Sequence, residues 1–213
     1  MNNPIYVSTG IFYINEKYIL TSNKVGSTFL RDNSIRCSIL KFNIKDSKIC
    51  NFYFDNFPGG LPNFAESEKN ISIMDKLDFV LYRNPFDRIK SSIFKEFIKY
   101  ADNHQIYKNK FQFDKWLSEI FKTQKNIDYT TDVHFNSYLS YMYEISKNYS
   151  FKFKRIEYIN ELTNISPNWP IESIHNIANM TDYDIRVLCN SFLKIDIDTE
   201  LDAFYNIERN IKI

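Results

Sequence analysis

The sequence predicts an α/β fold in which helices flank a central, mainly parallel β-sheet. Three observations carry this prediction. The run LDFVLYR (77–83) is short, apolar and rich in β-formers, as is typical of a strand buried on both faces. Apolar residues then recur at helical spacing from residue 86 to residue 97. Strand-like and helical stretches also alternate along the chain, as they do around a parallel sheet.

The N-terminal third should begin the sheet. The stretch IYVSTGIFYINEKYILTS (5–22) contains two strand-like runs around a turn signal at Asn15-Glu16. We expect a helix within 27–40 and another strand over 48–54. Two prolines and two glycines predict a loop at 57–64.

The remaining chain predicts mostly helices. Pro85 suits the first position of a helix, where its missing N–H is not needed. Further helices are expected over 113–125 and 136–147. Residues 151–159 predict one more strand that leads into a helix, and the helical spacing returns over 185–193.

Length and composition indicate one soluble domain over residues 1–213. The chain is 44% hydrophobic and carries a net charge of +1, so we expect a sizeable core and no nucleic-acid partner. Three cysteines without CxxC spacing predict reduced thiols instead of a disulfide framework or a metal site. The sequence contains neither a secretory signal nor about 18 consecutive apolar residues, so we expect a cytoplasmic protein that contacts no membrane.

The stretch ILTSNKVGSTFLRD (19–32) has the order of a phosphate-binding loop: a strand, a short polar turn and a helix start. Such a loop collects backbone N–H groups at the positive end of the helix. Lys24 adds a charge, and Ser27 and Thr28 add hydroxyl donors. The nucleoside-triphosphate loop GxxxxGK[ST] has its lysine after the last glycine, whereas Lys24 precedes Gly26. Taken alone, the stretch fits an ordinary strand–helix turn equally well.

A second anion-binding group is predicted at the end of the buried strand. Arg83 ends this strand, and Ser91 follows about two turns into the next helix. Ligands of open α/β sheets bind at this edge, and the guanidinium fork suits a phosphate. Alternatively, Arg83 pairs locally with Asp87 and Ser91 is a small packing residue. Two such groups in one small domain predict a ligand with two separate phosphates.

Together, the two stretches resemble motifs of the sulfotransferases that use 3′-phosphoadenosine 5′-phosphosulfate (PAPS). The loop 23–28, with Lys24-Val25-Gly26-Ser27-Thr28, resembles their 5′-phosphosulfate loop. RNPFDRIKS (83–91) resembles their 3′-phosphate motif, Arg-[Asp/Asn]-Pro-x-x-Arg-x-x-Ser.

A more diffuse similarity extends over residues 17–206 and is nearest to the membrane-type carbohydrate sulfotransferases and their bacterial relatives. TDVHFNSYLSYMYEI (131–145) resembles their Asp-x-His-aromatic segment, and FKRIEYINEL (153–162) resembles the strand that follows it. Residues 174–206 resemble their closing segment, although Leu193 replaces a tyrosine and the final spacing is longer.

The resemblance implies a P-loop-like three-layer fold and transfer of a sulfuryl group from PAPS to a hydroxyl or amine, with a carbohydrate acceptor favoured. Lys24 would stabilise the leaving phosphate oxygen, and no metal would be required. His175 and Asn176 would belong to a segment that closes over the nucleotide. The donor-binding residues implied are Lys24, Val25, Gly26, Ser27, Thr28, Arg83, Ser91, His175 and Asn176.

Two residues are candidates for the base that takes the acceptor's proton. Asp32 lies eight residues after Lys24, where heparan-type relatives carry a Glu, but it also suits a helix surface beside Arg31. His134 has an imidazole that titrates near neutral pH, but it also suits a helix cap. Two other classes stay open: a P-loop-type nucleotide kinase or NTPase, which the lysine position opposes, and a non-catalytic nucleotide-binding module.

Overall fold

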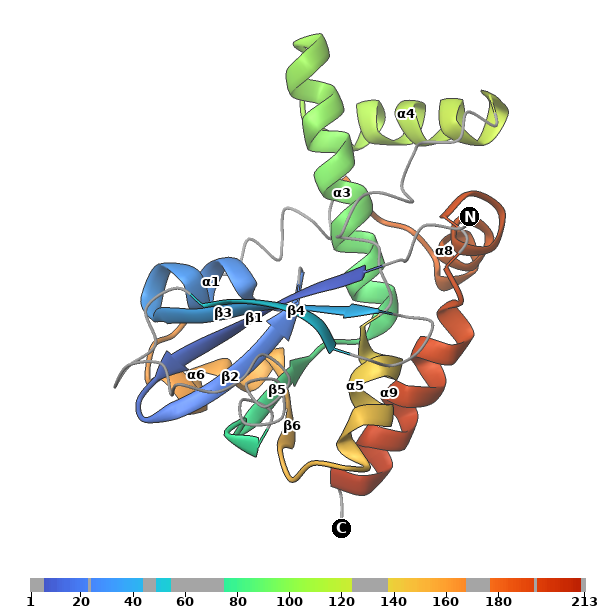
Figure 1. Cartoon of the computed structure of the whole chain (residues 1–213). Helices are drawn as coiled ribbons and strands as arrows, with labels where there is room; N and C mark the ends of the chain where they lie inside the picture. The colour runs from blue at the N-terminus through green and yellow to red at the C-terminus, as the bar shows by residue number, and fades with distance from the viewer. Residues whose placement is uncertain are drawn as a thin grey trace.

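The structure is a computed structural model that describes residues 6–22, 24–43, 49–54, 75–123, 138–167, 177–193 and 195–211. These residues form a mixed six-stranded sheet with helices on both faces, which confirms the predicted α/β class (Figure 1). The strands are β1 (Tyr6–Ile14), β2 (Lys17–Ser22), β3 (Ile35–Asn43), β4 (Ile49–Phe54), β5 (Phe79–Tyr82) and β6 (Lys152–Arg155).

The sheet has a parallel half and an antiparallel half, in the order β4-β3-β1-β2-β5-β6. β2, β5 and β6 run parallel, with Leu20 opposite Val80. β1 pairs antiparallel with β2 and β3, and β4 pairs antiparallel with β3. The predicted parallel arrangement therefore applies to β2, β5 and β6, and the other half of the sheet is antiparallel. The two-residue turn at Asn15-Glu16, where both residues have positive φ, makes β1 and β2 a hairpin and hence antiparallel.

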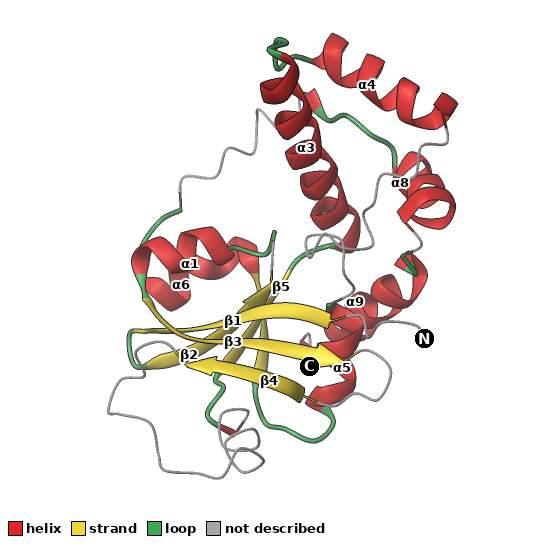
Figure 2. Ribbon diagram, turned by 45° about the horizontal axis from the view of Figure 1, so that its top comes forward, coloured by secondary structure: helices red, strands yellow, loops and turns green. Residues whose placement is uncertain are grey.

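The helices form two outer layers and a separate lobe. α1 and α6 lie on one face of the sheet, and α5 and α9 lie on the other (Figures 1 and 2). α3 extends away from the sheet, and α4 crosses the far end of α3. The helices are α1 (Ser27–Asn33), α3 (Pro85–His104), α4 (Lys110–Thr123), α5 (Leu139–Ser146), the 3₁₀-helix η1 (Ile156–Tyr158), α6 (Ile159–Thr163), α8 (Asp182–Leu188), the π-helix η2 (Cys189–Leu193) and α9 (Ile197–Ile211).

The helix predicted within 27–40 is shorter than expected. α1 ends at Asn33, and the chain enters β3 at Ile35. The Asn33 side-chain amide donates to the Phe29 carbonyl at 2.8 Å, and the Ser34 hydroxyl donates to the Leu30 carbonyl. Polar side chains of this kind replace the backbone bonds of a continuing helix. The next residues are then free to pair with β1 as a strand.

Two hydrophobic clusters stabilise the fold. The first surrounds the sheet and includes residues of α1, α5, α6 and α9. The second lies in the helical lobe, which we define as α3, α4, α8 and η2. There the ring of Phe97 meets Phe113 edge-on with centroids 5.3 Å apart. α9 joins both clusters, because its Leu201 packs in the lobe and its Phe204 packs against the sheet.

A buried carboxylate fixes the start of α5. Glu200 of α9 is 1% exposed and accepts hydrogen bonds from the N–H groups of Tyr138, Leu139 and Ser140 at 3.0–3.2 Å. A helix start leaves such N–H groups without intrahelical acceptors, so the carboxylate satisfies them. The Tyr138 hydroxyl donates to the Leu81 carbonyl of β5 at 3.1 Å. α5 is therefore held between the sheet and α9.

Candidate functional site

The two predicted phosphate-binding stretches follow the carboxyl ends of neighbouring parallel strands. β2 leads into loop 23–28, and β5 leads into motif 83–91. Because β2 and β5 pair directly and in parallel, both stretches leave the same edge of the sheet, where α1 and α3 begin (Figure 2). The Arg83 Nη1 atom lies 3.5 Å from the Lys24 carbonyl oxygen. The structure therefore brings these two predicted site residues together.

The loop after β2 is tightly folded. Lys24 and Gly26 have φ values of 64° and 80°, both in the left-handed region. The Val25 N–H donates to the Ser22 carbonyl at 3.2 Å, and the Thr21 hydroxyl donates to the Val25 carbonyl. Val25 is fully buried. Its amide therefore closes the turn, and its side chain anchors the loop in the core.

Gly26 is the N-cap residue, directly before the first residue of α1. A Cβ atom at this position would lie 3.3 Å from the Ile156 Cδ1 atom and 3.4 Å from the Ile159 Cδ1 atom, so η1 and α6 pack directly against the loop. Because glycine has no side chain, α1 begins without a side-chain cap. The N–H groups of Ser27 and Thr28, in the first turn, have no acceptor within the helix. Ser27 is half-buried and Thr28 is exposed.

Arg83 is half-buried, and its hydrogen-bond partner is the Lys24 carbonyl of this loop. Burial lowers the pKa of its guanidinium, and the attraction of Asp87 and Glu157 opposes that effect. The guanidinium stays charged, because arginine does not deprotonate in proteins. The sequence predicted Arg83 as a site residue with Asp87 as an alternative partner, and it did not predict that Glu157 contributes to the electrostatics of Arg83. The only signal for Glu157 is its position two residues after the end of the third parallel strand, β6.

The start of α3 orients the rest of the second motif. The Asn84 side chain accepts the Phe86 N–H at 2.9 Å and caps the helix, and Pro85 occupies its first position as predicted. Ser91 follows on α3 and is 7% exposed. Arg88 is also buried. Burial lowers the pKa of its guanidinium, and the negative charge of Glu200 makes the largest opposing contribution. Arg88 therefore belongs to the interior of the fold.

The predicted bases and closing residues are only partly described. Asp32 is exposed on α1, and its Oδ1 atom lies 3.1 Å from the Arg31 Nε atom. An exposed pair of this kind is weak, so the carboxylate is accessible to other partners. His134, His175 and Asn176 lie outside the described residues. Their roles stay predictions.

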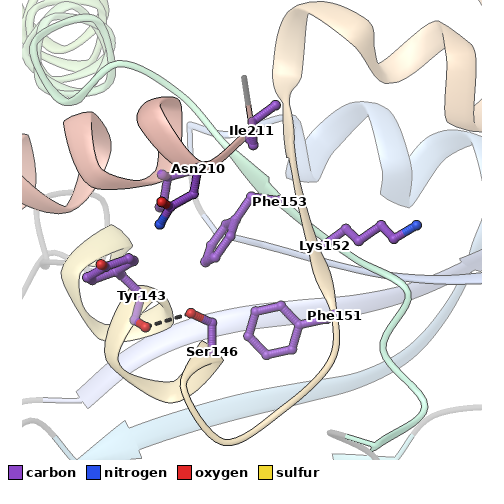
Figure 3. A pocket seen from close by; sticks show the side chains of 8 residues that line it. Tyr143, Ser146, Phe151, Lys152, Phe153, Asn210 and Ile211 are labelled. Carbon is purple, nitrogen blue, oxygen red and sulfur yellow. Dashed lines mark hydrogen bonds between the residues drawn. The ribbon is translucent and has the colours of Figure 1, made fainter. Parts of the chain in front are cut away.

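A surface hollow of about 420 Å³ lies away from the two loops. It is next to the amino end of β6, whereas the loops leave the carboxyl ends of the parallel strands. The Ser146 hydroxyl donates to the Tyr143 carbonyl at 2.7 Å on one side, and aromatic rings stand on the other (Figure 3). Its lining consists of Tyr143, Ser146, Phe151, Lys152, Phe153, Ile207, Asn210 and Ile211. The hollow is therefore not part of the candidate site.

Three further findings bear on the protein as a whole. Within the described ranges, no three His, Cys, Asp or Glu side chains gather as metal ligands would. None of the helices in the described part of the chain is long and apolar enough to cross a membrane. Comparison of the chain with protein-family models, with curated proteins and with solved structures yields no match in any of the three.

Proposed function

We propose that this protein is a sulfotransferase that moves a sulfuryl group from PAPS to a hydroxyl or amine of an acceptor. The observation that carries the proposal is the 3.5 Å approach of Arg83 Nη1 to the Lys24 carbonyl oxygen. This approach joins two motifs that resemble the 5′- and 3′-phosphate motifs of PAPS-dependent enzymes. PAPS carries phosphate groups on both sides of one ribose, so its binding site needs two anion-binding loops that lie close together.

The donor would lie along the carboxyl edge of β2 and β5, in a P-loop-like arrangement. Arg83 and Ser91 would bind the 3′-phosphate. The N–H groups at the start of α1, with the hydroxyls of Ser27 and Thr28, would bind the 5′-phosphate, since a helix start attracts anions. Lys24, two residues before Gly26, would place its ammonium group beside the bridging oxygen between phosphorus and sulfur.

The proposed reaction is an in-line displacement at sulfur. The bond between sulfur and the 5′-phosphate oxygen breaks, and a bond between sulfur and the acceptor oxygen or nitrogen forms. The electron pair of the broken bond stays on the phosphate oxygen, where Lys24 neutralises the developing charge. As in phosphoryl transfer, catalysis then consists mainly of positioning and charge stabilisation.

The acceptor's proton passes to a base, and Asp32 and His134 are the candidates. Asp32 is an exposed carboxylate on α1, the helix that begins at the donor loop. A sugar hydroxyl is the acceptor that the resemblance to the carbohydrate branch favours. His175 and Asn176 would close over the nucleotide.

The test compares wild-type protein with Lys24→Met in a sulfate-transfer assay. The assay uses labelled PAPS and a panel of glycans and small hydroxylated acceptors. We expect the transfer rate to fall by roughly 10²- to 10³-fold, as it does when an enzyme loses one group that stabilises transition-state charge. Lys115→Met, at an exposed position on α4, is the matched control and should leave the rate unchanged.

Thermal-shift measurements distinguish the other classes. Adenosine 3′,5′-bisphosphate should raise the melting temperature of the wild-type protein, whereas ATP with magnesium should not. The opposite pattern would point to a kinase or NTPase. Stabilisation by the bisphosphate without transfer to any acceptor in the panel would point to a non-catalytic nucleotide-binding module.

A further inference from the structure

The surface hollow beside the amino end of β6 has the size of a small-molecule binding site. Its volume of about 420 Å³ lies within the range of about 300–1,000 Å³ that is usual for such sites. α5, β6 and α9 all contribute to its lining. The donor loops leave the opposite ends of the parallel strands, so the hollow is separate from the donor site and can hold a ligand of its own.

The walls of the hollow are mainly aromatic, and other side chains hold them in place. The buried ring of Phe151 meets the ring of Phe153 edge-on, with centroids 5.6 Å apart. The Phe153 ring in turn meets the buried ring of Tyr82 edge-on at 6.1 Å. Ile207 of α9 is buried and adds to the apolar lining. Because these side chains are packed against one another, they present a fixed apolar surface to a ligand.

Two polar side chains accompany the aromatic walls. Asn210, in the last turn of α9, points toward the same space as the Phe153 ring (Figure 3). Its side-chain amide makes no hydrogen bond to any residue that the structure describes. The Ser146 hydroxyl donates to the Tyr143 carbonyl at 2.7 Å, so its oxygen can still accept a hydrogen bond. The hollow therefore offers both donors and acceptors beside its apolar surface.

The hollow has no charged group directed into it from the described residues that line it. Lys152 is the one charged residue among them, and its side chain extends away from the side of the strand where Phe151 and Phe153 lie (Figure 3). This direction follows from the alternation of side chains along a strand. A charged ligand would lose its solvation in the hollow without gaining an opposite charge. The lining therefore favours an uncharged ligand.

We propose that this hollow is a second binding site, which takes an uncharged sugar ring. A pyranose has a face of C–H groups and a rim of hydroxyls. The C–H face packs against the rings of Phe151 and Phe153, where it buries apolar surface. The hydroxyls exchange hydrogen bonds with Asn210 and Ser146. A ligand without hydroxyls would cover the Asn210 amide and leave it without a partner, which is unfavourable.

The test titrates ¹⁵N-labelled protein with the methyl glycosides of glucose, galactose, mannose, xylose and N-acetylglucosamine and follows the chemical shifts by NMR. At least one glycoside should shift the resonances of Ser146, Phe153 and the Asn210 side-chain amide. The dissociation constant should be in the millimolar range, as expected for a ligand of about a dozen heavy atoms.

Two further ligands test the chemistry of the hollow. Methyl glucuronide has the ring of the glucoside and adds a carboxylate, whereas cyclohexanol has a ring of the same size with a single hydroxyl. Each should bind roughly threefold to tenfold more weakly than the best glycoside. The glucuronide has to bring a charge into an uncharged hollow, and cyclohexanol cannot replace the hydrogen bonds of the sugar.

Two substitutions at Asn210 separate the amide from the space that it borders. Asn210 is exposed, so neither should disturb the fold. Asn210→Leu keeps a similar size without the amide and should raise the dissociation constant roughly threefold to tenfold, the effect of one hydrogen bond. Asn210→Trp fills the hollow and should abolish the shifts. Asn160→Leu, at an exposed position of α6 on the other face of the sheet, is the matched control and should leave binding unchanged.

The outcomes distinguish this inference from the proposed function. It is overturned if no glycoside of the panel produces saturable shifts around the hollow, or if Asn210→Leu binds as tightly as wild type. Equally tight binding of the glucuronide or of cyclohexanol overturns it too, because the site would then not select an uncharged sugar. Shifts confined to loop 23–28 and motif 83–91 would place the sugar at the candidate site and overturn the second site. The sulfate-transfer assay tests the proposed function independently of all these results.

Discussion

Single residues of the loop after β2 adopt backbone conformations that most side chains avoid. Lys24 has a φ of 64° although it is not a glycine, and Gly26 follows two residues later with a φ of 80°. A non-glycine residue in the left-handed region costs about 1 kcal/mol or more and persists only where its surroundings hold it. Here Val25 holds the loop through its buried side chain and its bond to Ser22. Such local strain is common at functional sites, which agrees with the role proposed for Lys24.

Gly26→Ala tests whether the loop conformation depends on this glycine. The alanine would have to keep a positive φ, and its Cβ atom would lie 3.3 Å from the Ile156 Cδ1 atom. We expect a loss of about 1–2 kcal/mol in the free energy of unfolding, which lowers the melting temperature by roughly 2–8 °C. Thr28→Ala, an exposed change in the same helix turn, should have a much smaller effect. Equal melting temperatures for Gly26→Ala and wild type would show that the loop relaxes without cost.

At the scale of elements, a polar cluster joins two parallel strands to the C-terminal helix. The Tyr82 hydroxyl at the end of β5 donates to Glu208 Oε1 of α9 at 2.5 Å. Arg155, at the end of β6, donates to both carboxylate oxygens of Glu208 at 2.7 and 2.5 Å. Its guanidinium also lies 5.5 Å from the ring centroid of Phe204. The cluster thus fixes α9 to the carboxyl ends of β5 and β6, the same edge of the sheet from which the candidate-site loops leave.

The Tyr82 phenol makes this connection sensitive to alkaline pH. Burial, together with the bond to Glu208, raises the pKa of the phenol well above its usual value near 10. The folded protein keeps the phenol proton at a pH where the unfolded chain loses it. This contribution to stability is therefore complete below about pH 10 and decreases by up to about 1.4 kcal/mol for each pH unit above it.

Tyr82→Phe isolates that effect. At pH 8 the variant should be less stable by about 1–2 kcal/mol, because it lacks the hydrogen bond to Glu208. The difference from wild type should narrow as the pH rises from 9 to 11, since the variant has no phenol to titrate. Urea unfolding at several pH values measures both quantities, with the exposed Tyr205→Phe of α9 as control. A difference that does not vary with pH would refute the role assigned to the phenol.

At the scale of the whole molecule, the sequence was most informative where a strand leads into a helix. The β2–α1 and β5–α3 units were predicted because each combines an apolar run with a polar turn and a helix start. β3 was missed because Asn33 and Ser34 end α1 early, through contacts that periodicity does not reveal. The antiparallel half of the sheet follows from the turn at Asn15-Glu16. The two strands that this turn joins were predicted, but their antiparallel place in the sheet was not.

The site was predictable only in part, for a related reason. The Lys24 and Arg83 loops each contain a local pattern, and their approach follows from the pairing of β2 with β5. Glu200 has no such pattern. It meets the N–H groups at the start of α5 only when segments about sixty residues apart pack together, so no local window of the sequence marks it.

A ligand that contacts both loops should reduce the mobility of both loops at once. If adenosine 3′,5′-bisphosphate binds both loops, it should slow amide hydrogen exchange at the starts of α1 and α3 together, although these segments are about sixty residues apart in the sequence. The hollow beside Phe151, at the opposite edge of the sheet, and the exposed turn around Tyr107 provide internal controls and should not change. Mass spectrometry of peptides that cover 22–30 and 83–91 measures the effect. Slower exchange in only one of these peptides would mean that the two loops do not bind one ligand, since a ligand that spans both must restrain both.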